Sequence, residues 1–310
     1  HTPTSGILYV LEFQPENQVE IEEQVQLNVG CTQIAWSQRE ESVLCCSCED
    51  NALRFFDLEG VDCLFREWVT PCATRSLDWD PISLDWILAV GEDESCRVFN
   101  TMQTEEEALH SFQDGSGEKQ LHGSWNNHRP LQFQSCQQDG SVALWDLRES
   151  QPTKKFTMHN GTCGMRLARN PYHEDLVAVA GFDSSLYMYD TRNTHTPVAF
   201  VPGAHDSLVT DLKWSPHSDR VLASSSTDRT LLLWDMTESV SQDVNRAPLV
   251  EDSNKVVTEV SSPRGGKRSL HKSQKMEDWV DCIDWTPHEV GTLALSCHDH
   301  LVKAYNIRED

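Results

Sequence analysis

The fold is decided by residues 204–236, which read AHDSLVTDLKWSPHSDRVLASSSTDRTLLLWDM. Three short strands are predicted here, at Leu208–Trp214, Val221–Ser226 and Leu231–Asp235. The first alternates apolar and polar residues, as expected of a strand with one buried face. Turn-forming residues separate the strands, at 215–219 and again at 227–230. The stretch therefore predicts a unit of three consecutive antiparallel strands.

The same pattern recurs along the chain and gives six units. Three marks define each unit: the last residue of the first strand, an aspartate in the second turn, and an acidic or amide residue that closes the third strand. The first and second marks are 14 residues apart and the second and third are 7 apart in every unit. The marks are Trp36, Asp50 and Asp57; Trp79, Asp93 and Asn100; Trp125, Asp139 and Asp146; Arg169, Asp183 and Asp190; Trp214, Asp228 and Asp235; and Trp285, Asp299 and Asn306.

A period of about 40–45 residues with a terminal Trp-Asp is typical of WD40 propeller blades. Leu8–Phe13 aligns with Leu53–Leu58, so residues 6–27 are predicted to be the outer half of one more blade. We therefore expect an all-β fold, a seven-bladed WD40 β-propeller whose first blade is incomplete in this chain. Because each blade buries its faces only against its neighbours, residues 1–310 are expected to form a single WD40 propeller domain.

One unit carries the side chains of a WD40 blade tetrad: His205, Ser224, Asp228 and Trp234. The combination of His, Ser and Asp also suggests a hydrolase triad. The aspartate recurs in all six units, however, whereas a catalytic site would occur once. We therefore predict a structural tetrad, no catalytic residues and a protein that is not an enzyme. The sequence also lacks the glycine patterns that bind phosphates or dinucleotides, so no cofactor is expected.

The eleven cysteines fall mostly within predicted strands. Strand alternation places Cys46 and Cys48 on one face and Cys45 on the other. A zinc site needs four ligands at knuckle spacing, and no second pair is found; His298-Asp299-His300 occupies a blade turn. We therefore expect buried reduced thiols, no metal and a reducing, cytoplasmic compartment. No apolar run is long enough for direct membrane insertion.

The charge and one irregular segment complete the prediction. A net charge of −24 argues against a partner with a phosphate backbone, so no nucleic-acid binding is expected. Residues 237–275 are rich in Ser, Thr, Asn and Gln and are expected to form a mobile insertion, within which Val256–Val260 supplies the outer strand of its blade.

A partner-binding surface is predicted at the blade ends that carry the second turns. The residue six positions before each first mark should lie there, and two of these residues, Leu208 and Trp279, are large and apolar on adjacent blades. Exposed aromatic anchors often dominate binding energy. With cationic Lys119 and the turn residue Arg229, they are the predicted partner-binding residues. The alternative for Trp279 is local packing over its own blade edge.

The chain resembles the EARP and GARP complex-interacting protein family, WD40 proteins associated with vesicle-tethering complexes. The resemblance rests on Gly123–His128, Asp190–Asn193, Ser224–Arg229 with the polar insertion that follows, and the half-blade Gly6–Phe13. It implies a non-catalytic scaffold or adaptor that binds other proteins in a multisubunit tethering complex, in the cytoplasm and at endosomes or the trans-Golgi network. One departure is that the insertion of the family is strongly acidic, whereas the later half of this one is basic.

Two alternatives stay open. Diphthine methylesterase, another WD40 protein, is similar to this chain at Gly6–Phe13, Leu77–Trp79 and Asp190–Asn193, which implies a hydrolase. The chain could equally be a WD40 subunit of an unrelated multiprotein assembly.

Overall fold

The structure is a computed structural model that describes residues 6–14, 18–59, 63–103, 110–236, 260–261, 267–268, 270–286, 290–298 and 302–306. Strands dominate this part of the chain, and its one helix is a short 3-10 turn at His159–Gly161. The chain also divides into two compact parts, each of which contains several of the repeats described above. From here on, unit 1 means His1–Lys155 and unit 2 means Phe156–Asp310.

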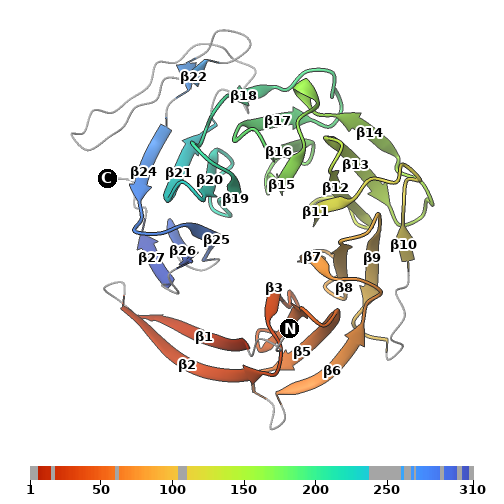
Figure 1. The fold of residues 1–310 in the computed structure, drawn as a ribbon, viewed down its shortest axis with the longest axis vertical. Helices are drawn as coiled ribbons and strands as arrows, with labels where there is room; N and C mark the ends of the chain where they lie inside the picture. The colour runs from red at the N-terminus through yellow and green to blue at the C-terminus, as the bar shows by residue number, and fades with distance from the viewer. Residues whose placement is uncertain are drawn as a thin grey trace. The chain divides into compact units, whose positions relative to one another are not determined.

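Unit 1 contains a hairpin followed by three four-stranded sheets, each made of strands consecutive in the sequence (Figure 1). The hairpin pairs β1 (Gly6–Gln14) with β2 (Gln18–Leu27). The sheets are β3 (Cys31–Trp36), β4 (Val43–Cys48), β5 (Ala52–Asp57) and β6 (Leu64–Val69); β7 (Thr74–Trp79), β8 (Trp86–Gly91), β9 (Cys96–Asn100) and β10 (His110–Phe112); and β11 (Gln120–Trp125), β12 (Gln132–Gln137), β13 (Ser141–Asp146) and β14 (Lys154–Thr157).

Unit 2 contains two four-stranded sheets and one three-stranded sheet. They are β15 (Gly164–Arg169), β16 (Leu176–Gly181), β17 (Leu186–Asp190) and β18 (Ala199–Val201); β19 (Val209–Trp214), β20 (Val221–Ser226), β21 (Thr230–Asp235) and β24 (Leu270–Lys275); and β25 (Val280–Trp285), β26 (Thr292–Cys297) and β27 (Val302–Asn306). The short strands β22 (Val260–Ser261) and β23 (Lys267–Arg268) pair with each other.

The predicted all-β propeller fold is confirmed. In each of the six blade sheets the first mark ends the first strand and the third mark ends the third strand. The hairpin β1–β2 takes the place of the incomplete first blade, as expected from residues 6–27.

One strand prediction is wrong. The outer strand beside β21 is β24 at Leu270–Lys275, and Val256–Val260 does not supply it. Its sequence, LHKSQK, lacks the alternation of apolar and polar residues by which a strand is recognised in a sequence. Most of residues 237–275 lies outside the described residues, so the mobility of the insertion stays a prediction, as does the single domain.

The aspartates of the second turns fold those turns by accepting backbone hydrogen bonds. Asp139 Oδ1 accepts the N–H of Ser141 at 2.8 Å, and Asp228 Oδ1 accepts that of Thr230 at 2.8 Å. The same contact forms at Asp50, Asp93 and Asp183. The residue after the aspartate often has positive φ, as at Arg229 (69°), which a short local turn requires. The regular spacing of the aspartates therefore has a local structural cause.

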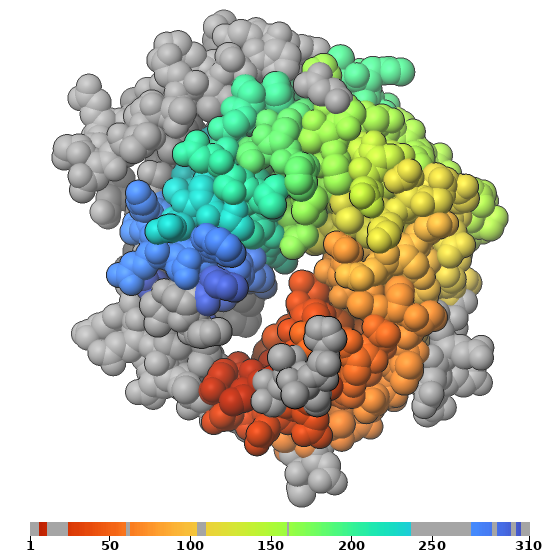
Figure 2. Space-filling model, viewed as in Figure 1, coloured from red at the N-terminus to blue at the C-terminus, as the bar shows by residue number. Residues whose placement is uncertain are grey.

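Apolar cores lie between neighbouring sheets. In unit 1, Phe55 and Trp68 pack against Trp79 and Ile87 of the next sheet. The following core joins residues of β8 and β9 to Trp125 and Trp145. In Figure 2 the orange and yellow atoms of these sheets lie side by side on the surface. Cys45 belongs to one core, and Cys46 and Cys48 to the core under the hairpin, which confirms the predicted alternation.

Trp36 is the exception among the tryptophans that end first strands. It is 42% exposed, whereas Trp79, Trp125, Trp214 and Trp285 are at most 8% exposed. The hairpin contributes Leu8 and Leu27 to a core with residues of β4 and β5, and neither Trp36 nor Ile34 belongs to that core. As a result Trp36 and its neighbour Ile34 on β3 stay accessible.

Candidate functional site

The four residues predicted as a tetrad form one hydrogen-bonded chain in unit 2. Trp234 Nε1 donates to Ser224 Oγ at 2.8 Å, and Ser224 Oγ lies 2.7 Å from His205 Nε2. On the other side of the ring, His205 Nδ1 lies 3.0 Å from Asp228 Oδ2. These hydrogen bonds thus tie the loop before β19 to β20, β21 and the turn between them.

The charge of Asp228 fits this structural arrangement. Burial alone would raise the pKa of Asp228, but hydrogen bonds from His205, Thr230 and the backbone N–H of Asp206 hold that pKa below its ordinary value. The His205 side chain is fully buried, and Ser224 has no exposed surface. These groups bind one another inside the blade, so the arrangement favours a structural role over contact with a substrate.

The predicted partner-binding residues lie at what we call the turn end of each unit, where second strands turn into third strands. In unit 2, the Leu208 carbonyl accepts the N–H of Thr227 at 3.1 Å, and the Trp279 carbonyl accepts that of His298 at 2.9 Å. Trp279 is 44% exposed, and its ring centroid lies 5.2 Å from that of His298. Trp279 is therefore both accessible and in local contact with its own sheet.

The two cationic residues of that prediction fall in different units. Arg229 is exposed in the turn between β20 and β21, in unit 2, and its carbonyl accepts the N–H of Met276 at 2.7 Å. Lys119 is exposed at the turn end of unit 1, where its carbonyl accepts the N–H of Gln138 at 2.9 Å. The structure thus brings Leu208, Arg229 and Trp279 to one turn end, without Lys119. That these residues bind a partner stays a prediction.

The turn end of unit 1 is rich in carboxylates, a feature that the sequence marks only through the aspartates of the turns. Its acidic residues are Glu49, Asp50, Glu92, Asp93, Glu94, Asp114, Glu118 and Asp139. They exceed the cationic residues beside them, which are Arg54, Arg75, Arg97, Lys119 and Lys155. The surface therefore keeps a negative balance after its ion pairs form.

One of these ion pairs joins Arg97 to Asp93 at 2.5 Å. Burial raises the pKa of Asp93, but the hydrogen bonds from Arg97 and Ser95 outweigh this effect and lower that pKa to about 2. The carboxylate is therefore ionised throughout the physiological range. Arg97 balances this charge, so the pair itself adds nothing to the negative excess of the turn end.

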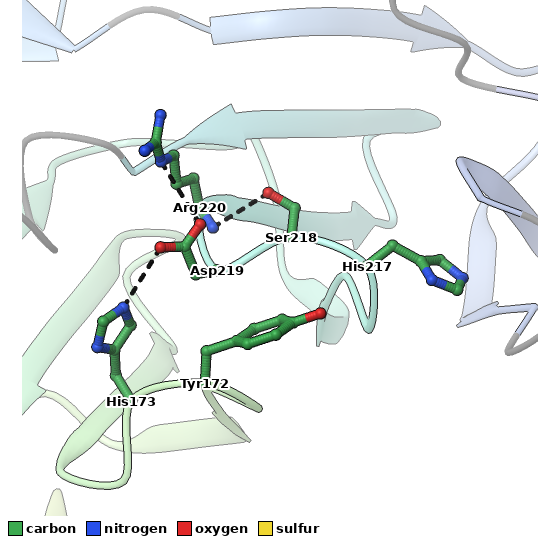
Figure 3. Close-up of a pocket in the computed structure, with 6 residues that line it drawn as sticks. All are labelled: Tyr172, His173, His217, Ser218, Asp219 and Arg220. Carbon is green, nitrogen blue, oxygen red and sulfur yellow. Dashed lines mark hydrogen bonds and ion pairs between the residues drawn. The ribbon is translucent and has the colours of Figure 1, made fainter.

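A hollow of about 370 Å³ opens at the opposite end of unit 2, between the first turns of two neighbouring sheets (Figure 3). The Tyr172 hydroxyl donates to the Pro216 carbonyl at 2.7 Å, and Asn170 Nδ2 donates to the Asp219 carbonyl at 2.9 Å. These two bonds tie the β15–β16 turn to the β19–β20 turn. A contact between the turns of two repeats has no signature along the chain, so sequence reasoning could not find it.

The polar side chains that line the hollow already have partners within the protein. Asp219 lies between His173 and Arg220, with His173 Nε2 at 3.5 Å and Arg220 Nε at 3.4 Å (Figure 3). His217 points away toward the Thr286 carbonyl, 3.0 Å from its Nε2. Across the described residues, no group of three or more His, Cys, Asp or Glu side chains could hold a metal.

Comparison with known proteins gives one family match and several relatives. Residues 196–235 match the family described as WD domain, G-beta repeat. The chain is 25% identical over 241 residues to Histone acetyltransferase type B subunit 2 of Debaryomyces hansenii, which covers 74% of this chain and 54% of that protein. It is 22% identical over 238 residues to Histone-binding protein MSI1 of Saccharomyces cerevisiae, with the same coverage of both chains.

A shorter alignment has higher identity. Histone acetyltransferase type B subunit 2 of Candida glabrata is 32% identical over 117 residues, which cover 37% of this chain and 26% of that protein. The chain thus spans about half the length, or less, of the curated relatives it matches.

These relatives correct the predictions of function, partner and location. All three are named for histones, so the resemblance to the EARP and GARP complex-interacting protein family and the role in vesicle tethering are wrong. The esterase alternative is not favoured either. The same names overturn two further predictions. One is a tethering-complex partner without nucleic acid. The other is a location in the cytoplasm and at endosomes or the trans-Golgi network. The motifs behind the resemblance are common among WD40 proteins, because they form the blades themselves.

In the part of the chain that the structure describes, no helix has the length and apolarity to cross a bilayer. The sequence match at residues 196–235 agrees with the blade geometry of β19–β21 and with the five other sheets built on the same marks. The chain contains a WD40 repeat and has the all-β fold of a WD40 β-propeller.

Proposed function

We propose that the chain is a non-catalytic, histone-binding WD40 scaffold. The observation that carries the proposal is the alignment of 74% of the chain with proteins named as a histone acetyltransferase subunit and as a histone-binding protein. The residue set most like a catalytic triad, His205, Ser224 and Asp228, is engaged in holding its own blade together. A binding role is therefore better supported than a chemical one.

Electrostatics supports the same proposal. Histones are basic proteins, and this chain has a net charge of −24. The turn end of unit 1 has more carboxylates than cationic side chains, which favours encounter with a cationic protein and disfavours acidic ones. The same negative charge that argues against binding a phosphate backbone thus favours binding a histone, a basic protein that itself binds such a backbone.

The proposed contact residues divide by their chemistry. Leu208 and Trp279 could serve as apolar anchors in unit 2, since Trp279 is 44% exposed. Lys119 and Arg229 would repel a cationic partner, so they are expected to oppose binding or leave it unchanged. Removing the positive charge of Lys119 should therefore not weaken binding to histones.

The test is a titration of fluorescently labelled, purified core histones with the chain, read by anisotropy at 0.15 M NaCl. The double variant Glu94→Gln, Glu118→Gln neutralises two carboxylates at the turn end of unit 1. We expect it to weaken binding about 5- to 10-fold, which is about 1–1.4 kcal/mol. The matched control Glu59→Gln, Glu149→Gln removes two exposed carboxylates from the other end of unit 1 and should change Kd less than 2-fold.

Two results would contradict the proposal. One is the lack of saturable binding with the chain at 10 µM or above, on the order expected of a weak interaction. The other is equal competition by polylysine at matched charge, because that would show attraction to any polycation and no histone recognition.

A further inference from the structure

Three cysteine side chains of unit 1 share one face of a sheet. Cys31 begins β3 and is paired directly with Cys48, the last residue of β4. Cys46 lies two residues earlier on β4, and its Sγ is 3.7 Å from that of Cys48. Residues directly opposite in antiparallel strands have Cβ atoms about 4.5–5.5 Å apart. A disulfide needs roughly 3.5–4.5 Å, so a small approach of Cys31 and Cys48 would suffice.

The three thiols differ in access and in acidity. Cys31 is half-buried, whereas Cys46 and Cys48 are at most 1% exposed. A hydrogen bond from Cys46 and the nearby Arg54 outweigh burial and the charge of Asp50, and they lower the pKa of Cys48 to about 7. Contacts with Cys31 and Cys48, together with burial, raise the pKa of Cys46. Near neutral pH a thiolate at Cys48 is thus supported by a thiol donor and a guanidinium.

We propose that Cys31 and Cys48 are an oxidation-sensitive pair that a peroxide converts into a cross-strand disulfide between β3 and β4. In the first step the accessible Cys31 sulfur attacks hydrogen peroxide; the O–O bond breaks, and sulfenic acid and water form. In the second step the Cys48 thiolate attacks the Cys31 sulfur. The S–O bond breaks, and the departing hydroxide takes a proton to become water. Two thiols lose two electrons in total, and one peroxide is reduced to two waters.

The site adjoins the acidic surface of unit 1. Cys48 immediately precedes Glu49, whose N–H donates to the Gly30 carbonyl at 3.0 Å. A disulfide between Cys31 and Cys48 would join β3 to β4 directly before the turn that connects β4 to β5. Formation of the bond does not depend on histone binding, so the proposal stands or fails independently of the proposed function.

Arg39 makes the test direct, because it lies between the two cysteines in the sequence. Trypsin cleavage after Arg39 and Arg54 separates Cys31 from the peptide 40–54, which contains Cys45, Cys46 and Cys48. The reduced full chain is treated with hydrogen peroxide, alkylated and digested without reductant. We expect a disulfide-linked pair of these peptides, reversed by dithiothreitol, with fragmentation that assigns the bond to Cys48.

Variants separate this site from general oxidation. Cys31→Ser and Cys48→Ser should each abolish the linked peptides. Cys46→Ser should retain the link but form it several-fold more slowly, since the hydrogen bond to Cys48 is lost. Cys63→Ser is the matched control, because Cys63 packs partly buried against the same core, and it should link at the wild-type rate.

The proposal is overturned if the linked peptides persist in Cys48→Ser, or if fragmentation places the bond on Cys45 or Cys46. It is also overturned if Cys31 proceeds to sulfinic acid without linkage. Should Cys48→Ser fail to fold, the fragmentation pattern of the wild-type link decides the question alone.

Discussion

At the scale of single residues, the hydroxyl of Ser224 has an unusually large share in holding its blade. It is the acceptor for Trp234 Nε1 and the partner of His205 Nε2, and all three side chains are buried. Ser224→Ala should lower the free energy of unfolding by about 2–6 kcal/mol, because two buried polar groups lose their partner at about 1–3 kcal/mol each. Urea unfolding followed by tryptophan fluorescence measures this loss.

The matched control is Ser135→Ala in unit 1. Ser135 also lies four residues before a turn aspartate, and its Oγ accepts Trp145 Nε1 at 2.9 Å. In place of the histidine ring, Ser135 has the thiol of Cys96 as its second partner, which is a weak donor, so the loss should be about half as large. Equal losses at the two sites would show that His205 adds nothing to the stability of its blade.

The ion pair between Asp93 and Arg97 should appear in the acid sensitivity of the protein. The pKa of Asp93 is about 2 in the fold and about 4 in an unfolded chain. Because the folded value is the lower one, the stabilisation is complete above pH 4 and is lost as pH falls from about 4 to 2. The Asp93 side chain is one-third exposed, so screening reduces the contribution to about 1 kcal/mol.

Asp93→Asn should therefore be less stable than the wild type at pH 7, and the difference should shrink toward zero at pH 2.5. Urea midpoints at pH 7, 4 and 2.5 measure it. A constant difference across this range would mean that the aspartate acts through its hydrogen bonds to Ser95 and not through its charge.

At the scale of elements, the first three strands of each blade could be predicted and the fourth could not. The first strand ends at a residue that packs on the preceding sheet, as Trp125 does, and the second turn needs an aspartate such as Asp139. Both requirements place a particular residue at a fixed spacing in the sequence. An outer strand pairs on one side only and has no fixed place after the third strand, so β24 and the three-residue β18 leave no mark at a fixed spacing, although β18 buries Ala199 and Val201.

The contrast between Trp36 and Trp125 gives an element-level prediction within unit 1. Trp125 has no exposed surface and sits between two sheets, so Trp125→Ala should cost about 3–5 kcal/mol. Trp36 is 42% exposed on β3, and Trp36→Ala should cost about 1–2 kcal/mol. Urea unfolding of both variants at two protein concentrations is the measurement. A loss at Trp36 as large as that at Trp125, and dependent on concentration, would show that a second copy covers β3 in solution.

At the scale of the whole molecule, the fold followed from the repeat but the partner did not. Blade residues serve the blade, so Asp190–Asn193 and Ser224–Arg229 could not distinguish one WD40 protein from another. The hollow at Tyr172 and Asp219 depends on two turns that are more than forty residues apart in sequence, at 170–175 and 215–220. The net charge of −24 can be read from the sequence, but alone it argues only against partners such as nucleic acid. The relatives named for histones supply a class of partner.

That charge predicts how salt affects the protein itself. With 49 acidic and 25 basic residues, repulsion between carboxylates persists even if every cation has a partner. The screening length falls from about 30 Å at 0.01 M salt to about 8 Å at 0.15 M. Surface ion pairs are worth at most about 1 kcal/mol each and also weaken, but the negative charges are in excess. We therefore expect Tm to rise by several degrees between 0.01 and 0.15 M NaCl, measured by thermal unfolding at pH 7.

The same change in salt should weaken histone binding, because screening reduces attraction between molecules as well as repulsion within one. Opposite signs of the two effects would trace both to the excess of carboxylates. KCl in place of NaCl should give the same Tm, since screening depends on ionic strength and not on the cation. A Tm that falls with salt would mean that ion pairs such as Arg97–Asp93 outweigh the net repulsion, and the charge would then be a weaker argument for a cationic partner.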